Sequence, residues 1–99
     1  MASCVILKTT KIYGKEYYPK LMELYSDDLD LFSVVGTDCE SWEDAMDWLC
    51  IDLDTEGKVP GAFCNTTSHP NENFEEVLEF AKVWCKSRKL KEDIKIVEI

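Results

Sequence analysis

The stretch LDLFSVVG (residues 29–36), followed shortly by SWEDAMDWLCIDLDTEG (residues 41–57), decides the fold. The first segment is apolar and β-branched and ends in glycine, which predicts a strand. The second begins with Ser41, a good N-cap residue with an acidic residue three positions on, and it ends at Gly57. Its apolar side chains recur at helical spacing, which predicts an amphipathic helix with an inward stripe of Ala45, Met46, Leu49 and Leu53.

Outward from this stretch, residues 3–10 and 94–99 are again apolar and β-branched, which predicts two more strands. If these two strands pair with each other, both termini lie in the sheet, and removing the last six residues should then unfold the protein. A second helix is predicted after Asn73, because Glu76 stands at the capping-box position. Glutamates open this helix and basic residues close it, the order that the helix dipole favours.

Two segments are harder to assign. Residues 15–28 have apolar residues at helical spacing, but the segment also fits the second strand of a hairpin, in which Pro19 would restrict it to a sheet edge. Periodicity favours the helix. Residues 58–72 are rich in Pro, Gly, Asn, Thr and Ser and are predicted to form a loop.

The sequence therefore predicts one α+β domain over residues 1–99, with a small, mainly antiparallel sheet of three to four strands and two or three helices packed on one face.

The charge is distributed very unevenly. The chain has 99 residues and a formal net charge of −9, and 45% of its residues are hydrophobic. Residues 21–57 contain twelve Asp or Glu and no Lys or Arg. The hydrophobic content argues against a disordered acidic tail, and the charge argues against direct binding to nucleic acid, which needs a basic face. A one-signed field of this kind steers a basic partner, although solubility alone is an alternative explanation.

We therefore predict a non-enzymatic binding or inhibitor protein that docks an acidic face on a basic protein partner, one that itself binds or cleaves nucleic acid. Such a face could imitate the phosphates that this partner normally holds. Trp42, at the start of the predicted helix, is the expected exposed anchor, whereas Trp48 is expected to pack inward. The sequence is compatible with either a monomer or a homo-oligomer. The predicted partner-binding residues are Asp27, Asp28, Asp30, Glu40, Trp42, Glu43, Asp44, Asp47 and Asp54.

Catalytic motifs are scarce. The sequence has no Gly-rich phosphate loop, no HExxH and no GxSxG, and no cofactor is expected. His69 is the only histidine, and one alternative function is a small enzyme that pairs it with Cys64 as nucleophile. A second alternative is nucleic-acid binding through the basic cluster of residues 82–91, although cations at a helix end also offset the dipole.

The five cysteines are odd in number and widely spaced, and the chain opens without a secretory signal. We therefore expect free thiols in a reducing cytoplasm, with Cys4, Cys50 and Cys85 in the core. No apolar run approaches the roughly 20 residues that span a bilayer. Zinc would need more ligands than Cys64 and His69 supply, so no metal is predicted.

Residues 31–60 resemble the N-terminal part of HicB-type antitoxins. The matching residues are Phe32 to Gly36, then Ser41 to Ala45 at the helix start, then the segment Glu56-Gly57-Lys58-Val59-Pro60. The resemblance implies a small α+β fold that binds and occludes a basic, RNA-cleaving toxin, and it carries no catalytic residue. The chain departs from the family pattern before residue 29 and after residue 60, where many members have a DNA-binding module.

Overall fold

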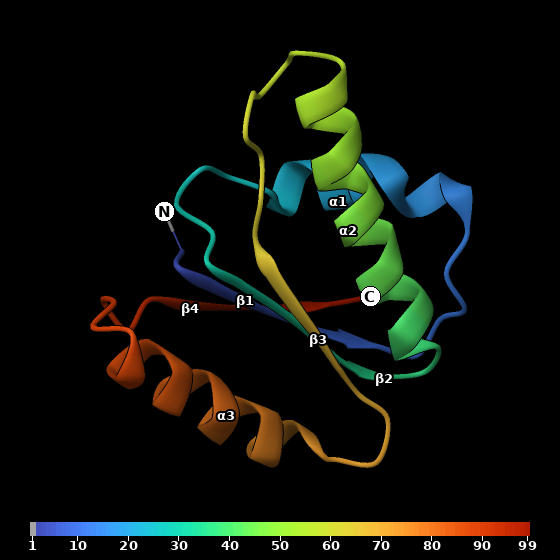
Figure 1. The fold of residues 1–99 in the computed structure, drawn as a ribbon. Coiled ribbons are helices and arrows are strands. Elements are labelled where there is room, and N and C mark those ends of the chain that lie inside the picture. Colours follow the sequence, from blue (N-terminus) through green and yellow to red (C-terminus); the bar gives the residue numbers. More distant parts are fainter. Residues whose placement is uncertain (1) are drawn as a thin grey trace.

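Strands and helices alternate along the chain (Figure 1). The computed structural model describes residues 2–99. No helix in this part of the chain is long and apolar enough to cross a membrane. The elements in chain order are β1 (Cys4–Thr9), the 3-10 helix η1 (Lys15–Tyr17), α1 (Tyr18–Leu24), β2 (Leu31–Gly36), α2 (Cys39–Thr55), β3 (Asn65–His69), α3 (Phe74–Ser87) and β4 (Ile94–Glu98).

The four strands form one sheet in the order β3-β2-β1-β4, and every neighbouring pair is parallel. The α+β composition is confirmed, but the expectation of a mainly antiparallel sheet is wrong. The first strand does pair with the last, so both termini lie in the sheet. Parallel neighbours need a crossover connection, usually a helix, and each connection here contains one. The error came from the predicted loop 58–72, which contains β3 and thereby hid one strand–helix–strand unit.

Helices cover both faces of the sheet, so the expectation of helices on one face is also wrong. The helices α1 and α2 pack on one face, and α3 packs on the other, against β1 and β2 (Figure 1). The chain moves outward from β1 to β2 to β3 and then returns past them to β4. With right-handed crossovers, this reversal of direction places the last helix on the opposite face.

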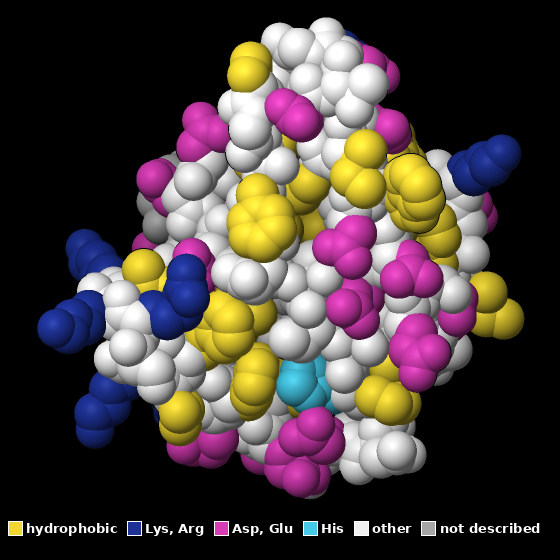
Figure 2. Space-filling model, viewed as in Figure 1, with side chains coloured by type: hydrophobic (Ala, Val, Ile, Leu, Met, Phe, Trp, Pro, Cys, Tyr) yellow, Lys and Arg dark blue, Asp and Glu magenta, His cyan; other side chains and the backbone are white. Residues whose placement is uncertain are grey.

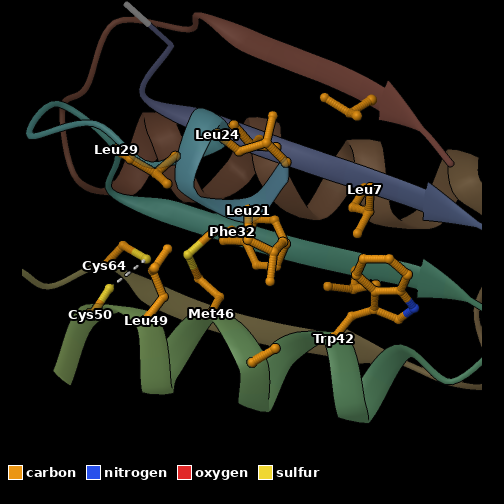
Figure 3. Close-up of a cluster of buried hydrophobic side chains, with 14 of the residues drawn as sticks. Leu7, Leu21, Leu24, Leu29, Phe32, Trp42, Met46, Leu49, Cys50 and Cys64 are labelled. Carbon is orange, nitrogen blue, oxygen red and sulfur yellow. Dashed lines mark hydrogen bonds between the residues drawn. The ribbon is translucent and has the colours of Figure 1, made fainter. Parts of the chain in front are cut away.

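Each face has its own apolar core, because alternate strand residues point to opposite sides. On the α2 face, Leu7 and Phe32 pack against Trp42 and Met46 (Figure 3). On the α3 face, a smaller cluster is formed by Cys4, Ile6, Leu31, Val35, Val77, Ala81 and Cys85. All five cysteines are free and buried, as expected for the three that were assigned to the core.

The helix boundaries agree with the sequence in part. Residues 15–24 are helical, so the hairpin alternative is excluded. The capping box of Asn73 and Glu76 is present at the start of α3. The helix α2 begins at Cys39 after Asp38, so Ser41 is not its N-cap. The turn before α2 requires Gly36, which has φ +113°, and a Cβ there would clash with the Thr9 carbonyl oxygen.

Candidate functional site

The helix α2 carries five of the predicted partner-binding carboxylates along its outward side. Its inward side is fixed by the buried residues of the α2-face core, so the remaining positions face solvent or the edge strand β3. Three of these carboxylates are exposed and two are partly buried. The five residues are Glu40, Glu43, Asp44, Asp47 and Asp54, and we call them the α2 carboxylates.

Two of the α2 carboxylates meet over β3. The Thr66 hydroxyl lies 3.1 Å from Glu43 Oε2 and 2.8 Å from Asp47 Oδ1. A hydroxyl has one proton to donate, so it cannot satisfy both carboxylates at once. Burial raises the pKa of Asp47, and the charges of Glu43 and Asp44 raise it further, while the bond from Thr66 acts in the opposite direction. Glu43, Asp44 and Asp47 therefore repel one another at this point of α2.

No lysine or arginine in residues 2–99 forms an ion pair with any α2 carboxylate. Figure 2 shows acidic side chains gathered over the α2 side of this face, whereas Lys and Arg lie mostly at the left, over the end of α3. On this face, most of the lysine and arginine side chains are therefore separated from the acidic side chains over α2.

The other three predicted acidic residues, Asp27, Asp28 and Asp30, lie outside α2. Asp27 and Asp28 are exposed on the loop between α1 and β2. This loop touches the segment before β3, because the Phe63 amide donates to the Tyr25 hydroxyl. Asp30 is withdrawn, since it pairs with Arg88 at 2.8 Å and accepts a hydrogen bond from Trp84.

The two tryptophans of α2 are reversed relative to the prediction. Trp42 is fully buried, donates from Nε1 to the Lys11 carbonyl, and packs against Tyr13 and Tyr17, so it cannot anchor a partner. Trp48 is 63% exposed. The two residues are six positions apart on the helix. This spacing corresponds to one full turn and about two-thirds of the next, so the two side chains face different sides.

Exposed apolar side chains accompany Trp48 at the C-terminal half of α2. Ile51 and Phe63 are both large and exposed. They border a groove of about 410 Å³ between α2 and the segment that leads into β3. Sequence reasoning missed both residues. Phe63 lies in a segment that was predicted to be a loop. Ile51 could have been recognised as exposed, because a residue five positions after the inward-facing Met46 points away from the core. The groove is lined by Asp47, Cys50, Ile51, Asp54, Ala62, Phe63 and Cys64.

Cys64 and His69 do not form a catalytic pair. Cys64 packs in the α2-face core, with its Sγ 3.9 Å from Cys50 Sγ, whereas His69 contacts Phe80 of α3 at the other end of β3 and on the other face. The Cys50 thiol and burial both raise the pKa of Cys64 above the ordinary value, which disfavours a thiolate nucleophile.

The histidine belongs instead to a hydrogen-bonded chain on the α3 face. His69 Nδ1 lies 2.7 Å from Glu72 Oε1, and Nε2 lies 2.9 Å from Thr67 Oγ1, which in turn is 2.7 Å from Ser33 Oγ. Ser33 and His69 are buried. Among residues 2–99 no cluster of three or more His, Cys, Asp or Glu could hold a metal ion.

A second cavity lies at the carboxyl ends of β1, β2 and β4, where open parallel sheets commonly bind ligands. It measures about 540 Å³. The Lys8 ammonium on its wall is already engaged, 3.4 Å from Glu98 and 4.4 Å from the Phe74 ring centre. None of the predicted site residues lines this cavity, whose walls are Lys8, Thr9, Thr10, Val35, Gly36, Phe74, Glu98 and Ile99.

Comparison with known proteins places the chain in a family. The protein-family model described as "Domain of unknown function (DUF7684)" matches residues 4–99. The chain belongs to this family. The DUF7684 match covers all four strands and all the helices, so the family corresponds to the whole sheet with both of its helical layers. No curated protein and no solved structure matches the chain.

Proposed function

We propose that this protein is a non-enzymatic binding protein that docks the α2 carboxylates on a basic site of a protein partner. The observation that carries the proposal is that these five side chains share one side of a helix with no neutralising cation among residues 2–99. Their mutual repulsion costs folding stability, and a bound cationic surface would offset that cost.

The exposed apolar residues beside the charge support an interface. Interfaces combine aromatic anchors with charges that select the partner and speed its approach. Trp48 now takes the anchoring role that the sequence had assigned to Trp42, since it stands exposed beside Asp44 and Asp47. The docking face in this proposal consists of the α2 carboxylates together with Trp48, Ile51 and Phe63.

The partner class follows from the charge. A row of carboxylates resembles the phosphates along a nucleic acid, so the favoured partner is a protein that binds or cleaves nucleic acid. The segment that resembles HicB-type antitoxins, residues 31–60, spans β2 and α2 and therefore includes all five α2 carboxylates. An antitoxin, or a phage inhibitor of a host defence protein, fits this reading, and the expected location is the cytoplasm.

The test compares two triple variants that remove the same charge from different faces. One carries Glu43→Gln, Asp44→Asn and Asp47→Asn on α2. The control carries Glu75→Gln, Glu79→Gln and Glu92→Gln at exposed positions in or after α3. Each protein is used to capture partners from a lysate of the source organism, and the captured protein is purified and its Kd measured from low to high ionic strength.

We expect the α2 triple variant to weaken binding at least tenfold and the control to change it little. The affinity of the unmodified protein should fall steeply as salt rises, because screening shortens the reach of exposed charges. An affinity that is flat with salt, or equal losses in the two variants, would contradict docking through α2.

A further inference from the structure

The groove beside α2 has an apolar floor that is open to solvent. Phe63 is 68% exposed and Ile51 is 49% exposed, although both are large hydrophobic side chains. Cys50 and Cys64 are buried beneath them. An open apolar trough of about 410 Å³ leaves a partner's apolar side chain room to pack.

A carboxylate stands toward each end of this trough. Asp47 and Asp54 are seven residues apart on α2, which corresponds to about 10 Å along a helix. One oxygen of each faces a donor on the segment that runs beside α2: Asp47 Oδ1 lies 2.8 Å from the Thr66 hydroxyl, which it shares with Glu43, and Asp54 Oδ1 accepts from the Gly61 amide at 2.7 Å. The second oxygen of each has no hydrogen-bond donor within residues 2–99. Each of these two carboxylates thus keeps an oxygen that can accept from an incoming group.

This arrangement identifies the chemistry of its occupant. The aliphatic stem of arginine packs on apolar surface, its guanidinium stacks on aromatic rings, and its planar fork matches a carboxylate better than the ammonium of lysine does. A second copy of this chain is disfavoured, because each copy carries a net charge of −9.

We infer that the groove receives a partner segment with two arginines about 10 Å apart and an apolar side chain between them. The inference rests on the proposed function and specifies what the basic partner presents to α2. In the polyproline II conformation, which short peptides commonly adopt, residues three apart lie on the same side of the peptide and are separated by about 9 Å. A tetrapeptide with arginine at both ends and leucine between them is therefore the simplest probe.

The first experiment titrates the ¹⁵N-labelled protein with acetyl-Arg-Leu-Leu-Arg-amide and follows backbone amide shifts by NMR. We expect a Kd on the order of 1 mM, with the largest shifts in residues 47–54 and 61–64. The matched peptides acetyl-Lys-Leu-Leu-Lys-amide and acetyl-Arg-Gly-Gly-Arg-amide should each bind more weakly. Shifts confined to other residues, or no shifts at about 10 mM peptide, would overturn the inference.

The second experiment repeats the titration on variants. Phe63→Ala removes the aromatic wall, and Asp54→Asn removes one charge while keeping an oxygen for the Gly61 amide. Each should weaken the arginine peptide about two- to fivefold. The controls are Val83→Ala, an exposed apolar residue on α3, and Asp28→Asn, an exposed carboxylate outside the groove. Both controls should leave the Kd unchanged.

The outcomes separate this inference from the proposed function. If the α2 triple variant loses the purified partner while Phe63→Ala and Asp54→Asn keep it, docking through α2 stands and the arginine groove is wrong. If the partner is unaffected by every one of these variants, both are wrong. Loss of the partner in the groove variants together with the triple variant supports both.

Discussion

The side chain of Asp47 is held in an unfavourable electrostatic position. It is partly buried, it stands one helical turn from Glu43 and Asp44, and its pKa is raised above 3.8 by burial and by these two charges. The folded state therefore binds a proton at Asp47 more readily than the unfolded state does. Protonation of Asp47 therefore stabilises the folded state. This stabilisation is fully present below the pKa of Asp47 in the unfolded chain, and it is lost as the pH rises through the pKa of Asp47 in the folded protein.

Asp47→Asn should consequently stabilise the protein at pH 7, by about 0.2–0.5 kcal/mol, the usual size of one like-charge pair on a helix. The asparagine oxygen can still accept from Thr66. Urea unfolding of both proteins at pH 7 and near pH 3 measures the effect. The advantage of the variant should disappear at the lower pH, and an Asp47→Asn protein that is less stable at pH 7 would contradict the assigned repulsion.

His69 is expected to act in stability rather than in catalysis. His69→Ala removes the group that joins Thr67 to Glu72, and it leaves the partly buried Thr67 hydroxyl, and through it the buried Ser33 hydroxyl, with fewer partners. The expected loss is about 1–3 kcal/mol in the free energy of unfolding, measured by urea denaturation. Ser68→Ala, on the other side of the same strand, is the control. Equal losses in the two variants would show that the hydrogen-bonded chain contributes nothing specific.

At the scale of elements, β4 completes the sheet although it lies at an edge. It pairs with β1 along five residues, and it contributes Val97 to the α2-face core. Removing residues 94–99 should cost more than the 5–15 kcal/mol that typically stabilises a domain, because it exposes both β1 and part of each core. Loss of the cooperative unfolding transition, followed by circular dichroism, is the expected result.

A control keeps the strand and changes only its surface. Ile96 is 46% exposed on β4, so Ile96→Thr should retain both the ladder with β1 and the folded state. A shortened protein that still unfolds cooperatively would contradict the role of β4.

The missed strand explains most of the error in the predicted fold. The five residues of β3, NTTSH, contain no aliphatic or β-branched apolar side chain, and they lie at an edge of the sheet. Their strand conformation comes from pairing with β2, and their side chains bond to groups on α2 and to Ser33. Such tertiary contacts leave no periodic signal in the sequence, whereas β1, β2, α2, α3 and β4 are apolar enough to be predicted.

The candidate site was predictable to a similar extent. The segregation of acidic residues is a property of the sequence, and the phase of α2 then gathers five of them on its outward side. Asp30 is unavailable to a partner because it is paired with Arg88, which is 58 residues away in the sequence. This pairing results from the packing of α3 against β1 and β2, which the sequence did not indicate. The groove likewise depends on how the segment before β3 passes α2, which the sequence could not indicate.

For the whole molecule, the net charge of −9 makes self-repulsion a general cost of folding. Adding about 0.5 M KCl should raise the melting temperature, by about 2–8 °C if screening recovers 0.5–1 kcal/mol. Thermal unfolding followed by circular dichroism measures this shift. The α2 triple variant should show a smaller salt response than the α3 control variant, and an equal response would mean that the repulsion is spread evenly over the surface.

The parallel pairing of β1 with β4 also has a mechanical consequence. Residue 4 and residue 98 lie at opposite ends of two adjacent, parallel strands. Tension applied between these two points would load all the backbone hydrogen bonds of the pair together, in shear, rather than peel them apart one after another. A protein held at these two ends is therefore expected to withstand stretching best along the direction of its own strands.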